Sequence, residues 1–293
     1  MGAYYLLDTQ KNSFEKIADI SPWLKPEYMA KVENIRFKSR DSLLINGYLT
    51  LPPGIEPKNL PVVVYIHGGP WTRVKWGFDY VSQFLANRGY AVLNVNYRGS
   101  TGYGKKFFQA GFKEWGGKML DDVNDGTKWL LEQKIADPNR IAVFGFSFGG
   151  YSSLMALAKN PELYSCGIDY SGIISVESLF ESIPSYYTPF LEMMYEMIGN
   201  PKTEFEMLKK ISPLYLTDKI NKPVMIIHGK RDNRVKYDDV VKFVSKLKKN
   251  GTEVEFIVKD DEGHSFMNEE NRIELFRKIE SFLAKHLAHS EFN

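Results

Sequence analysis

A G-x-S-x-G pattern occupies residues 145–149, with Ser147 at its centre. A strand-like run at 140–144 precedes the pattern, and a helix-like segment at 151–159 follows it. In a strand–turn–helix setting, such a pattern holds the serine hydroxyl on a sharp turn above a sheet, where a base can reach it. Only small neighbours fit around that turn, and glycines flank this serine on both sides. The sequence therefore predicts Ser147 as the nucleophile of a serine hydrolase.

A serine hydroxyl becomes an effective nucleophile only when a base accepts its proton, and that base is most often histidine. After a serine of this kind, an acid and then the histidine are expected further along the chain. His264, His286 and His289 lie far enough downstream. The last two fall in a charged C-terminal helix and tail, whereas His264 falls on a loop after the last predicted strand. His264 is therefore the predicted base.

The acid that orients the histidine should follow an earlier strand, and Asp232 lies in the loop after the strand-like run 224–228. A buried carboxylate there would hold the imidazole tautomer and stabilise the imidazolium. Asp238 and Asp239 compete, but they begin the next helix and are typical of helix N-terminal charges. The acidic residues 260–262 lie close to the predicted base and are expected to be solvated. Asp232 is the preferred acid.

A developing oxyanion needs two hydrogen-bond donors. The backbone N–H of the residue after the nucleophile, Phe148, supplies one, and a loop after an earlier strand supplies the other. Residues 67–70, His-Gly-Gly-Pro, follow the apolar run 62–66. Gly69 is the predicted second donor, because glycine lets the backbone approach the substrate closely. Standing alone, a Gly-Gly-Pro triplet would indicate only a surface turn.

Strand-like and helix-like segments alternate from about residue 61 onward. Strands are predicted at 62–66, 91–95, 141–144, 166–170, 224–228 and 253–258, and helices at 78–88, 119–132, after Ser147, at 238–249 and at 269–287. Repeated strand–helix–strand units favour an α/β fold with a mostly parallel central sheet and helices on both faces.

Two regions interrupt this alternation. Residues 1–60 have β-type patterns, including a hairpin at 35–38 and 43–51 that leads into the main sheet. Residues 171–223 form a long insertion rich in aromatic residues and methionine. Insertions of that length at the ends of sheet strands are usually functional, so we expect a small helical cap over the catalytic face.

The composition excludes several classes of function. The 293 residues are 43% hydrophobic and 25% charged with a net charge of +2, so neither nucleic acid nor an anionic membrane is an expected partner. Cys166 is the single cysteine, and no signal peptide or bilayer-spanning run is visible, so we expect a soluble, cytoplasmic protein. The chain has no metal-ligand spacing and no dinucleotide fingerprint, and no metal or cofactor is predicted.

Six motifs, taken together, resemble a known family. They are HGGP at 67–70, NYRGSTGYG at 96–104, WGGKMLDDV at 115–123, GFSFGGY at 145–151, DNRV at 232–235 and EGH at 262–264. In this order across residues 30–285, they resemble the catalytic domain of the prolyl oligopeptidase family, in particular its acylaminoacyl peptidase and dipeptidyl peptidase branches. The resemblance implies an α/β-hydrolase fold. It also implies Ser147 as nucleophile, Asp232 as orienting acid and His264 as base.

The resemblance extends to the substrate pocket. It implies that Ile173, Phe180 and Val235 lie near the pocket for the acyl-side residue. His67 is also a candidate substrate-binding residue. Dipeptidyl peptidase relatives have an oxyanion-binding tyrosine at this position, whereas acylaminoacyl peptidases have a histidine there, so backbone donors are expected to form the oxyanion hole. Trp71 either lines the leaving-group side or packs structurally. The aromatic and methionine residues of the cap form either an acyl pocket or the cap's own core; they are Tyr186, Tyr187, Phe190, Met193, Met194 and Tyr195.

The chain also departs from the family pattern. Members usually carry a large N-terminal β-propeller, for which this sequence has no room, and residues 4–20 look like the last strands of one. We therefore expect an N-terminal β-type extension at 1–30 and a catalytic domain at 31–293, in either a fragment or a naturally short member. The propeller's paired glutamates, which recognise a peptide amino terminus, are absent. Apolar surface left without a propeller favours self-association into a homo-oligomer.

Three functions are compatible with these residues. The first is cleavage of short peptide amides through an acyl-enzyme, and the second is a promiscuous carboxylesterase that uses the same triad on a small-molecule ester. The third is a non-catalytic binding module of the same fold. Such modules usually lose a member of the triad, and all three candidates are present here.

Overall fold

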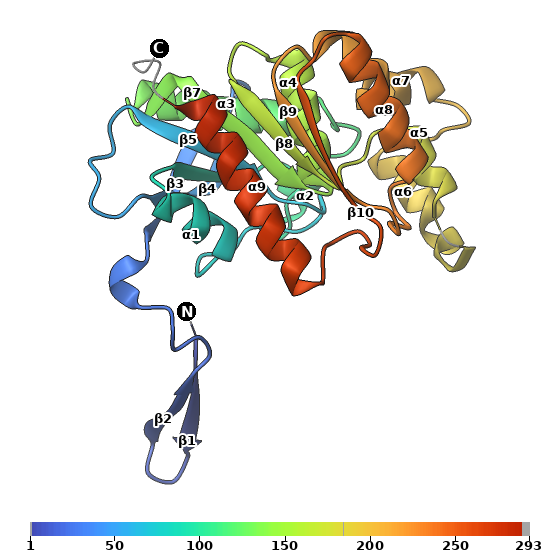
Figure 1. The fold of residues 1–293 in the computed structure, drawn as a ribbon. Coiled ribbons are helices and arrows are strands. Elements are labelled where there is room, and N and C mark those ends of the chain that lie inside the picture. The colour runs from blue at the N-terminus through green and yellow to red at the C-terminus, as the bar shows by residue number, and fades with distance from the viewer. Residues whose placement is uncertain (1, 184, 289–293) are drawn as a thin grey trace.

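The main body of the molecule is a single eight-stranded sheet with helices packed on it (Figure 1). The computed structural model describes residues 2–183 and 185–288, without the side chains of residues 185–187. The strands of this sheet are β3 Lys31–Lys38, β4 Leu44–Leu51, β5 Leu60–Ile66, β6 Ala91–Asn96, β7 Ala136–Phe146, β8 Cys166–Tyr170, β9 Val224–Gly229 and β10 Val254–Lys259. The helices packed on it are α1 Tyr80–Asn87, α3 Lys118–Glu132, α4 Phe148–Lys159, α8 Tyr237–Lys249 and α9 Glu269–Leu287, with the short α2 Lys105–Gln109 in a connection.

The strand order is β10-β9-β8-β7-β5-β6-β4-β3. The six strands from β10 to β6 are parallel, and β4 and β3 add an antiparallel hairpin at one edge. Near the centre of the sheet, Val64 of β5 pairs with Leu93 of β6 and with Val143 of β7. The predicted mostly parallel sheet is therefore confirmed, and so is the hairpin that leads into it.

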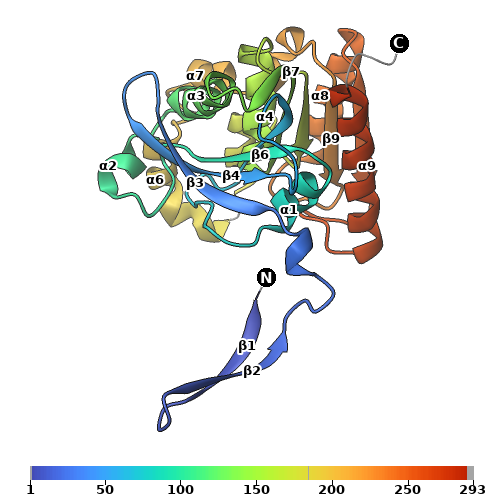
Figure 2. The ribbon, with the colours of Figure 1, turned by 90° about the vertical axis from the view of Figure 1, so that its left-hand side faces the viewer.

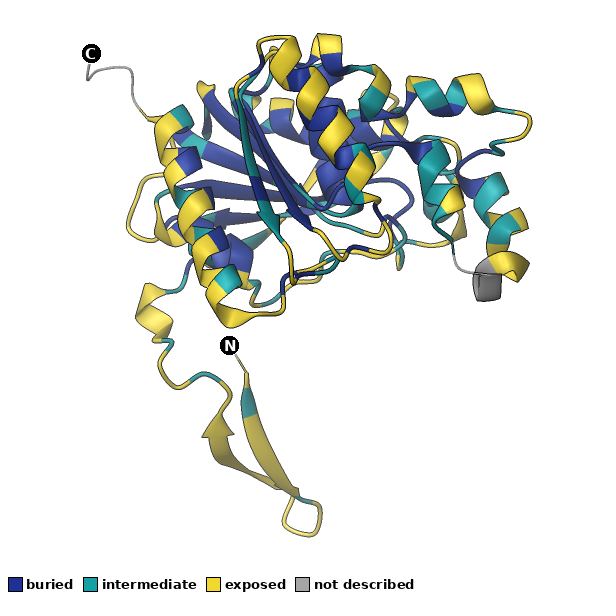
Figure 3. Cartoon of the chain, turned by 45° about the vertical axis from the view of Figure 1, so that its right-hand side comes forward, coloured by how far each residue is buried: buried dark blue, intermediate teal, exposed yellow. Residues whose placement is uncertain are grey.

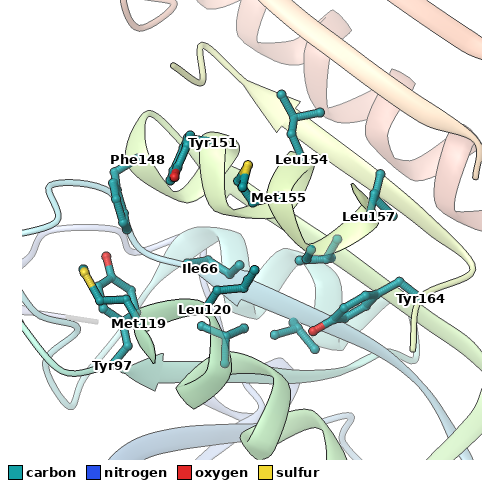
Figure 4. Packing of buried hydrophobic residues seen from close by; sticks show 14 of the residues in the cluster. Ile66, Tyr97, Met119, Leu120, Phe148, Tyr151, Leu154, Met155, Leu157 and Tyr164 are labelled. Carbon is teal, nitrogen blue, oxygen red and sulfur yellow. The ribbon is translucent and has the colours of Figure 1, made fainter. Parts of the chain in front are cut away.

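Helices cover both faces of the sheet (Figures 1 and 2). Successive residues of β5 alternate between two cores: Val62 and Val64 join the core under α3, α4 and α8, whereas Val63 joins the core under α1 and α9. Because both faces are covered, the central strands are continuous apolar runs. Figure 4 shows the first core, in which α4 side chains pack against α3 and the end of β5.

One strand begins earlier than predicted. Strand β7 starts at Ala136, whose partner in β5 is Leu60, although the sequence indicates a strand only from residue 141. Residues 137–139, Asp-Pro-Asn, have the composition of a turn, and proline is normally confined to strand ends and edges. A register shift between Leu60 and Val62 accommodates this segment.

The N-terminal strands form a separate small sheet. β1 Ala3–Asp8 pairs antiparallel with β2 Ser13–Asp19, and the hairpin projects away from the main body (Figure 1). Every residue of β2 is exposed (Figure 3). A 3₁₀ turn at Pro26–Tyr28 then leads to β3.

The segment between β8 and β9 is made of short helices, as predicted. These are α5 Val176–Glu181, α6 Leu191–Met197 and α7 Phe205–Lys210, with 3₁₀ helices at Ser185–Phe190, Pro213–Tyr215 and Thr217–Lys219. The hydroxyl of Ser178 donates to Asp239 at 2.6 Å, and that of Ser182 donates to the carbonyl of Arg234 at 2.9 Å. The insertion therefore packs on the loop and helix that follow β9. Across residues 2–183 and 185–288, no helix has both the length and the apolar character needed to cross a membrane.

Candidate active site

Ser147 lies on a sharp turn between β7 and α4. Its backbone has φ 57° and ψ −119°, a strained conformation that a non-glycine residue adopts only where the surrounding structure holds it. A Cβ atom on Gly145 would lie 2.2 Å from the carbonyl carbon of Gly149, and one on Gly149 would lie 2.1 Å from the oxygen of Ile66. The glycines on both sides are therefore required for strand and helix to meet at this turn.

The structure brings the three predicted triad residues together. The Oγ of Ser147 lies 2.9 Å from Nε2 of His264, and Nδ1 of His264 lies 2.7 Å from Oδ2 of Asp232. The three side chains follow β7, β10 and β9, which are parallel, so their carboxyl ends meet at one edge of the sheet. This geometry can pass the serine proton to Nε2 while a carboxylate holds the opposite side of the ring.

Asp232 is buried and hydrogen-bonded on both oxygens. Besides His264, it accepts hydrogen bonds at Oδ1 from the backbone N–H groups of Arg234 at 2.8 Å and Val235 at 3.1 Å. Burial alone would raise the pKa of this carboxyl, but the hydrogen bonds from His264 and the backbone hold the pKa of Asp232 below its ordinary value. Asp232 is therefore suited to remain an anion beside the ring of His264.

The acidic residues just before His264 differ in their exposure to solvent. The side chain of Asp260 is 82% exposed, as expected, but Glu262 is only 3% exposed. The prediction that Glu262 is solvated is therefore wrong. Its carboxylate accepts hydrogen bonds from the backbone N–H groups of Met267 and Asn268, which lie on the other side of His264 in the same loop.

The predicted oxyanion donors lie on two segments that come close to Ser147. Phe148 is the first residue of α4, so its N–H has no intrahelical acceptor. The loop of Gly69 passes close by: a Cβ atom on Gly68 would lie 3.5 Å from the Cβ of Ser147. Among the residues that the structure describes, the N–H groups of Gly69 and Phe148 have no protein acceptor. Both remain available to a substrate oxygen.

His67 lies behind this loop. Its ring stacks on Tyr97 at 4.2 Å, and its Nε2 lies 3.1 Å from the hydroxyl of Ser100. Burial lowers the pKa of His67 to about 4, so the ring is neutral at physiological pH. His67 thus supports the loop from the protein side. Trp71 is half-buried, with its ring 6.4 Å from that of Trp115.

The residues predicted near the acyl pocket lie in or against one core. Ile173 and Val235 are buried members of the cluster that contains Phe148, and the half-buried Phe180 packs against that cluster. In the cap, Phe190 and Met193 are exposed, Met194 packs on that core, and Tyr195 packs on Phe180. The aromatic and methionine residues of the cap therefore do not share one environment. His289 and the side chains of Tyr186 and Tyr187 lie outside the described residues.

Tyr170, the last residue of β8, contacts both the Ser147 turn and the His264 loop. The sequence patterns do not identify this residue. Its carbonyl accepts a hydrogen bond from the N–H of Ser147 at 2.8 Å, and its hydroxyl accepts one from the N–H of Phe266 at 2.5 Å. This position follows from β8 lying beside β7 in the sheet, where Tyr170 pairs with Phe146. Among the described residues, no group of histidine, cysteine, aspartate and glutamate is arranged to hold a metal ion.

Comparison with protein families shows a match to the prolyl oligopeptidase family over residues 76–290. Dipeptidyl aminopeptidase BIII of Pseudoxanthomonas mexicana is 36% identical over 291 residues, which is 96% of this chain and 42% of that protein. Dipeptidyl peptidase family member 6 of Caenorhabditis elegans is 35% identical over 303 residues, or 95% of this chain and 41% of that protein. The chain thus spans less than half the length of these relatives.

Solved structures agree with the observed architecture. The acylaminoacyl peptidase of Pyrococcus horikoshii superposes with a TM-score of 0.86 at 27% identity, covering 99% of this chain and 47% of that one. An acylaminoacyl peptidase in complex with Z-Gly-Gly-Phe-chloromethyl ketone superposes with a TM-score of 0.85 at 28% identity. The superposition covers 99% of this chain and 46% of that one. The fold is the α/β-hydrolase fold of these peptidases, as the sequence motifs predict.

Proposed function

Because the chain belongs to the prolyl oligopeptidase family, we propose that it is a serine peptidase that cleaves short peptide amides through an acyl-enzyme on Ser147. The observation that carries this proposal is the continuous line of contacts from Ser147 through His264 to Asp232.

In the first step, the Oγ of Ser147 attacks the carbonyl carbon of the substrate while Nε2 of His264 takes its proton. Asp232 holds the ring in the tautomer with hydrogen on Nδ1 and stabilises the imidazolium that forms. The backbone N–H groups of Phe148 and Gly69 donate to the oxyanion of the tetrahedral intermediate. His264 then gives its proton to the leaving amine as the carbon–nitrogen bond breaks.

In the second step, water replaces the amine. His264 takes a proton from water, the resulting hydroxide attacks the acyl carbon, and the same two N–H groups bind the oxyanion. The proton on His264 returns to Oγ of Ser147 as the ester bond breaks and the acid leaves. No step requires a group beyond the protein and water.

The names of the relatives favour an amide over an ester as the physiological bond. The relatives and structures compared above are named as dipeptidyl or acylaminoacyl peptidases, so a carboxylesterase is not favoured. We further propose that Ile173, Phe180 and Val235 border the acyl pocket and that His67 and Trp71 support the oxyanion loop. The position of Ile173, Phe180 and Val235 in or against the core that contains Phe148 is compatible with this assignment.

We also propose that residues 1–30 form an extension distinct from a catalytic domain at 31–293, with the cap at about 171–223. Two features support this division. β1 and β2 pair only with each other in the sheets of the described residues, and β3 begins the main sheet at Lys31. The domain boundary therefore coincides with the entry of the chain into the main sheet.

The test compares one acyl group carried on an ester and on an anilide. Ser147→Ala is the blank, and Ser265→Ala is the matched control because Ser265 is exposed and follows His264 directly. We expect the wild type and Ser265→Ala to cleave the anilide, and Ser147→Ala to lose at least about 10⁴-fold in kcat/KM. Ester turnover without anilide cleavage would indicate a carboxylesterase, and activity retained in Ser147→Ala would exclude the site assignment.

A further inference from the structure

The loop that carries His264 is held by side chains. It connects β10 to α9, and three consecutive backbone N–H groups beyond His264 donate to side-chain acceptors. The N–H of Phe266 donates to the hydroxyl of Tyr170 at 2.5 Å. The N–H groups of Met267 and Asn268 donate to the two oxygens of Glu262, at 2.7 and 3.0 Å. The carboxylate thus ties the two ends of a short loop together around His264.

Glu262 is a buried carboxyl group whose hydrogen-bond partners are all donors. Besides the two backbone N–H groups, the side-chain amide of Asn271 donates to it at 2.8 Å. Its own backbone carbonyl accepts the N–H of Arg231 at 2.9 Å, which links this loop to the loop of Asp232. A buried carboxylate is stable only when hydrogen bonds replace its lost water, and hydrogen bonds to a charged acceptor are the stronger kind.

Tyr170 connects this loop to the nucleophile. Its carbonyl accepts the N–H of Ser147, while its hydroxyl accepts the N–H of Phe266. Its ring packs between Phe146 at 4.9 Å and Phe266 at 5.3 Å, measured between ring centroids. One residue at the end of a central strand therefore contacts the serine turn through its backbone carbonyl and the histidine loop through its side chain.

We propose that Glu262 and Tyr170 are positioning residues that keep Nε2 of His264 within hydrogen-bonding distance of Oγ of Ser147. Proton transfer needs the two heavy atoms about 3 Å apart, and a misplacement of about 1 Å can lower a rate about 100-fold. This inference rests on the function proposed above. The hydrogen bonds themselves are independent of it, so a test of the loop can be separated from a test of the reaction.

Tyr170→Phe removes one hydroxyl and keeps the ring. A cavity of about 230 Å³ borders Tyr170 and Phe266, so water can partly replace the lost acceptor. We expect kcat to fall about 10-fold with KM within about twofold of wild type, because one hydrogen bond is weakened while the substrate pocket is unchanged. Tyr80→Phe is the matched control, since Tyr80 lines the same cavity and is 54% exposed.

Glu262→Gln keeps the shape but turns one acceptor oxygen into an N–H₂ donor. That donor would face another donor, from Met267, Asn268 or Asn271, and at least one hydrogen bond is lost. We expect kcat to fall about 10- to 100-fold, again with KM within about twofold. Glu269→Gln is the control, because Glu269 is exposed in the first turn of α9.

Two readouts separate positioning from a purely structural role. The first is kcat per active site, with sites counted by complete labelling with a fluorophosphonate; the second is amide hydrogen exchange at residues 266–268. The proposal expects a lower kcat per labelled site, faster exchange confined to residues 262–271, and wild-type behaviour in both controls. An unchanged kcat per labelled site, with or without a loss of labelled protein, would overturn it.

If the wild type cleaved neither ester nor anilide, the proposed function would fail, and exchange at 266–268 would still decide whether these side chains hold the loop. Protection in the wild type with loss of protection in both variants would support that part of the inference. Equal exchange in the wild type, the variants and the controls would overturn it.

Discussion

Asp169 is a buried carboxyl group close to the nucleophile that the proposed reaction does not use. It lies in β8, and its Oδ1 accepts the N–H of Gly172 at 2.7 Å. The same oxygen packs against α4, where a Cβ atom on Gly150 would lie 2.2 Å away. Burial raises the pKa of Asp169 from its ordinary 3.8 to about 7. Asp169 therefore contacts both the start of the cap and the helix that follows Ser147. Its charge is unfavourable in this buried position when the carboxyl group is ionised.

Asp169→Asn tests the consequence for stability. Between pH 3.8 and about 7, the unfolded chain has released the proton that folded Asp169 retains. The wild type should therefore lose stability as the pH rises through this window, by on the order of 2–4 kcal/mol. Asparagine keeps an oxygen for Gly172 but does not titrate, so the variant should not show this loss. Urea unfolding at about pH 4.5 and about pH 7.5 measures it, and a stability difference that is independent of pH would contradict the prediction.

At the scale of elements, a buried ion pair joins three segments, one of which contacts His67. Arg98 follows β6 and is buried. Its guanidinium binds Asp122 of α3 at 2.7 Å and Asp41 of the β3–β4 turn at 2.7 Å. Asp122 also accepts the backbone N–H of Arg98, at 2.8 Å. Since Ser100 of the same segment contacts His67, this ion pair is linked to the loop that carries Gly69.

Asp122→Asn should destabilise the fold strongly, because removing one partner leaves the buried charge of Arg98 poorly compensated. We expect the free energy of unfolding to fall by about 3 kcal/mol, measured by urea denaturation. Glu181→Gln is the comparison, because it breaks an exposed ion pair with Lys236 and should change stability by less than about 1 kcal/mol. Equal losses in the free energy of unfolding for the two substitutions would show that burial of the Arg98 ion pair does not determine its contribution to stability.

Strong local patterns allowed most of these elements to be predicted from the sequence. The apolar runs at 62–66, 91–95 and 224–228 coincide with β5, β6 and β9, because a strand covered on both faces needs such runs. The candidate triad followed from the strand–turn–helix setting of Ser147 and from chain order. Both signals are local, or depend only on the order of elements along the chain.

The parts that were missed depend on contacts between distant segments. The early start of β7 follows from pairing with Leu60, against a turn-like local sequence. The burial of Glu262 follows from the way its loop folds back toward α9, and acidic residues are normally exposed. Tyr170 contacts both Ser147 and Phe266 only because β8 lies next to β7. No local periodicity carries this information.

At the scale of the whole molecule, the β1–β2 hairpin projects away from the main body, and most of its residues are exposed (Figures 1 and 3). Tyr5 and Leu6 of β1 and Phe14 of β2 are each more than half exposed. An isolated two-stranded hairpin is marginally stable in water, and its open edges can pair with another chain. The relatives are more than twice as long as this chain.

We therefore expect this chain to self-associate through the hairpin. Sedimentation velocity over a range of concentrations should show species larger than the 33.7 kDa monomer. Leu6→Lys with Phe14→Lys should shift the distribution toward monomer, because charge on an exposed edge opposes pairing and reduces the apolar patch. Gln10→Lys in the hairpin turn adds a charge without removing an apolar side chain and should leave the distribution unchanged. A monomer at every concentration in the wild type would exclude association through the hairpin, and equal shifts in the two variants would attribute the effect to net charge.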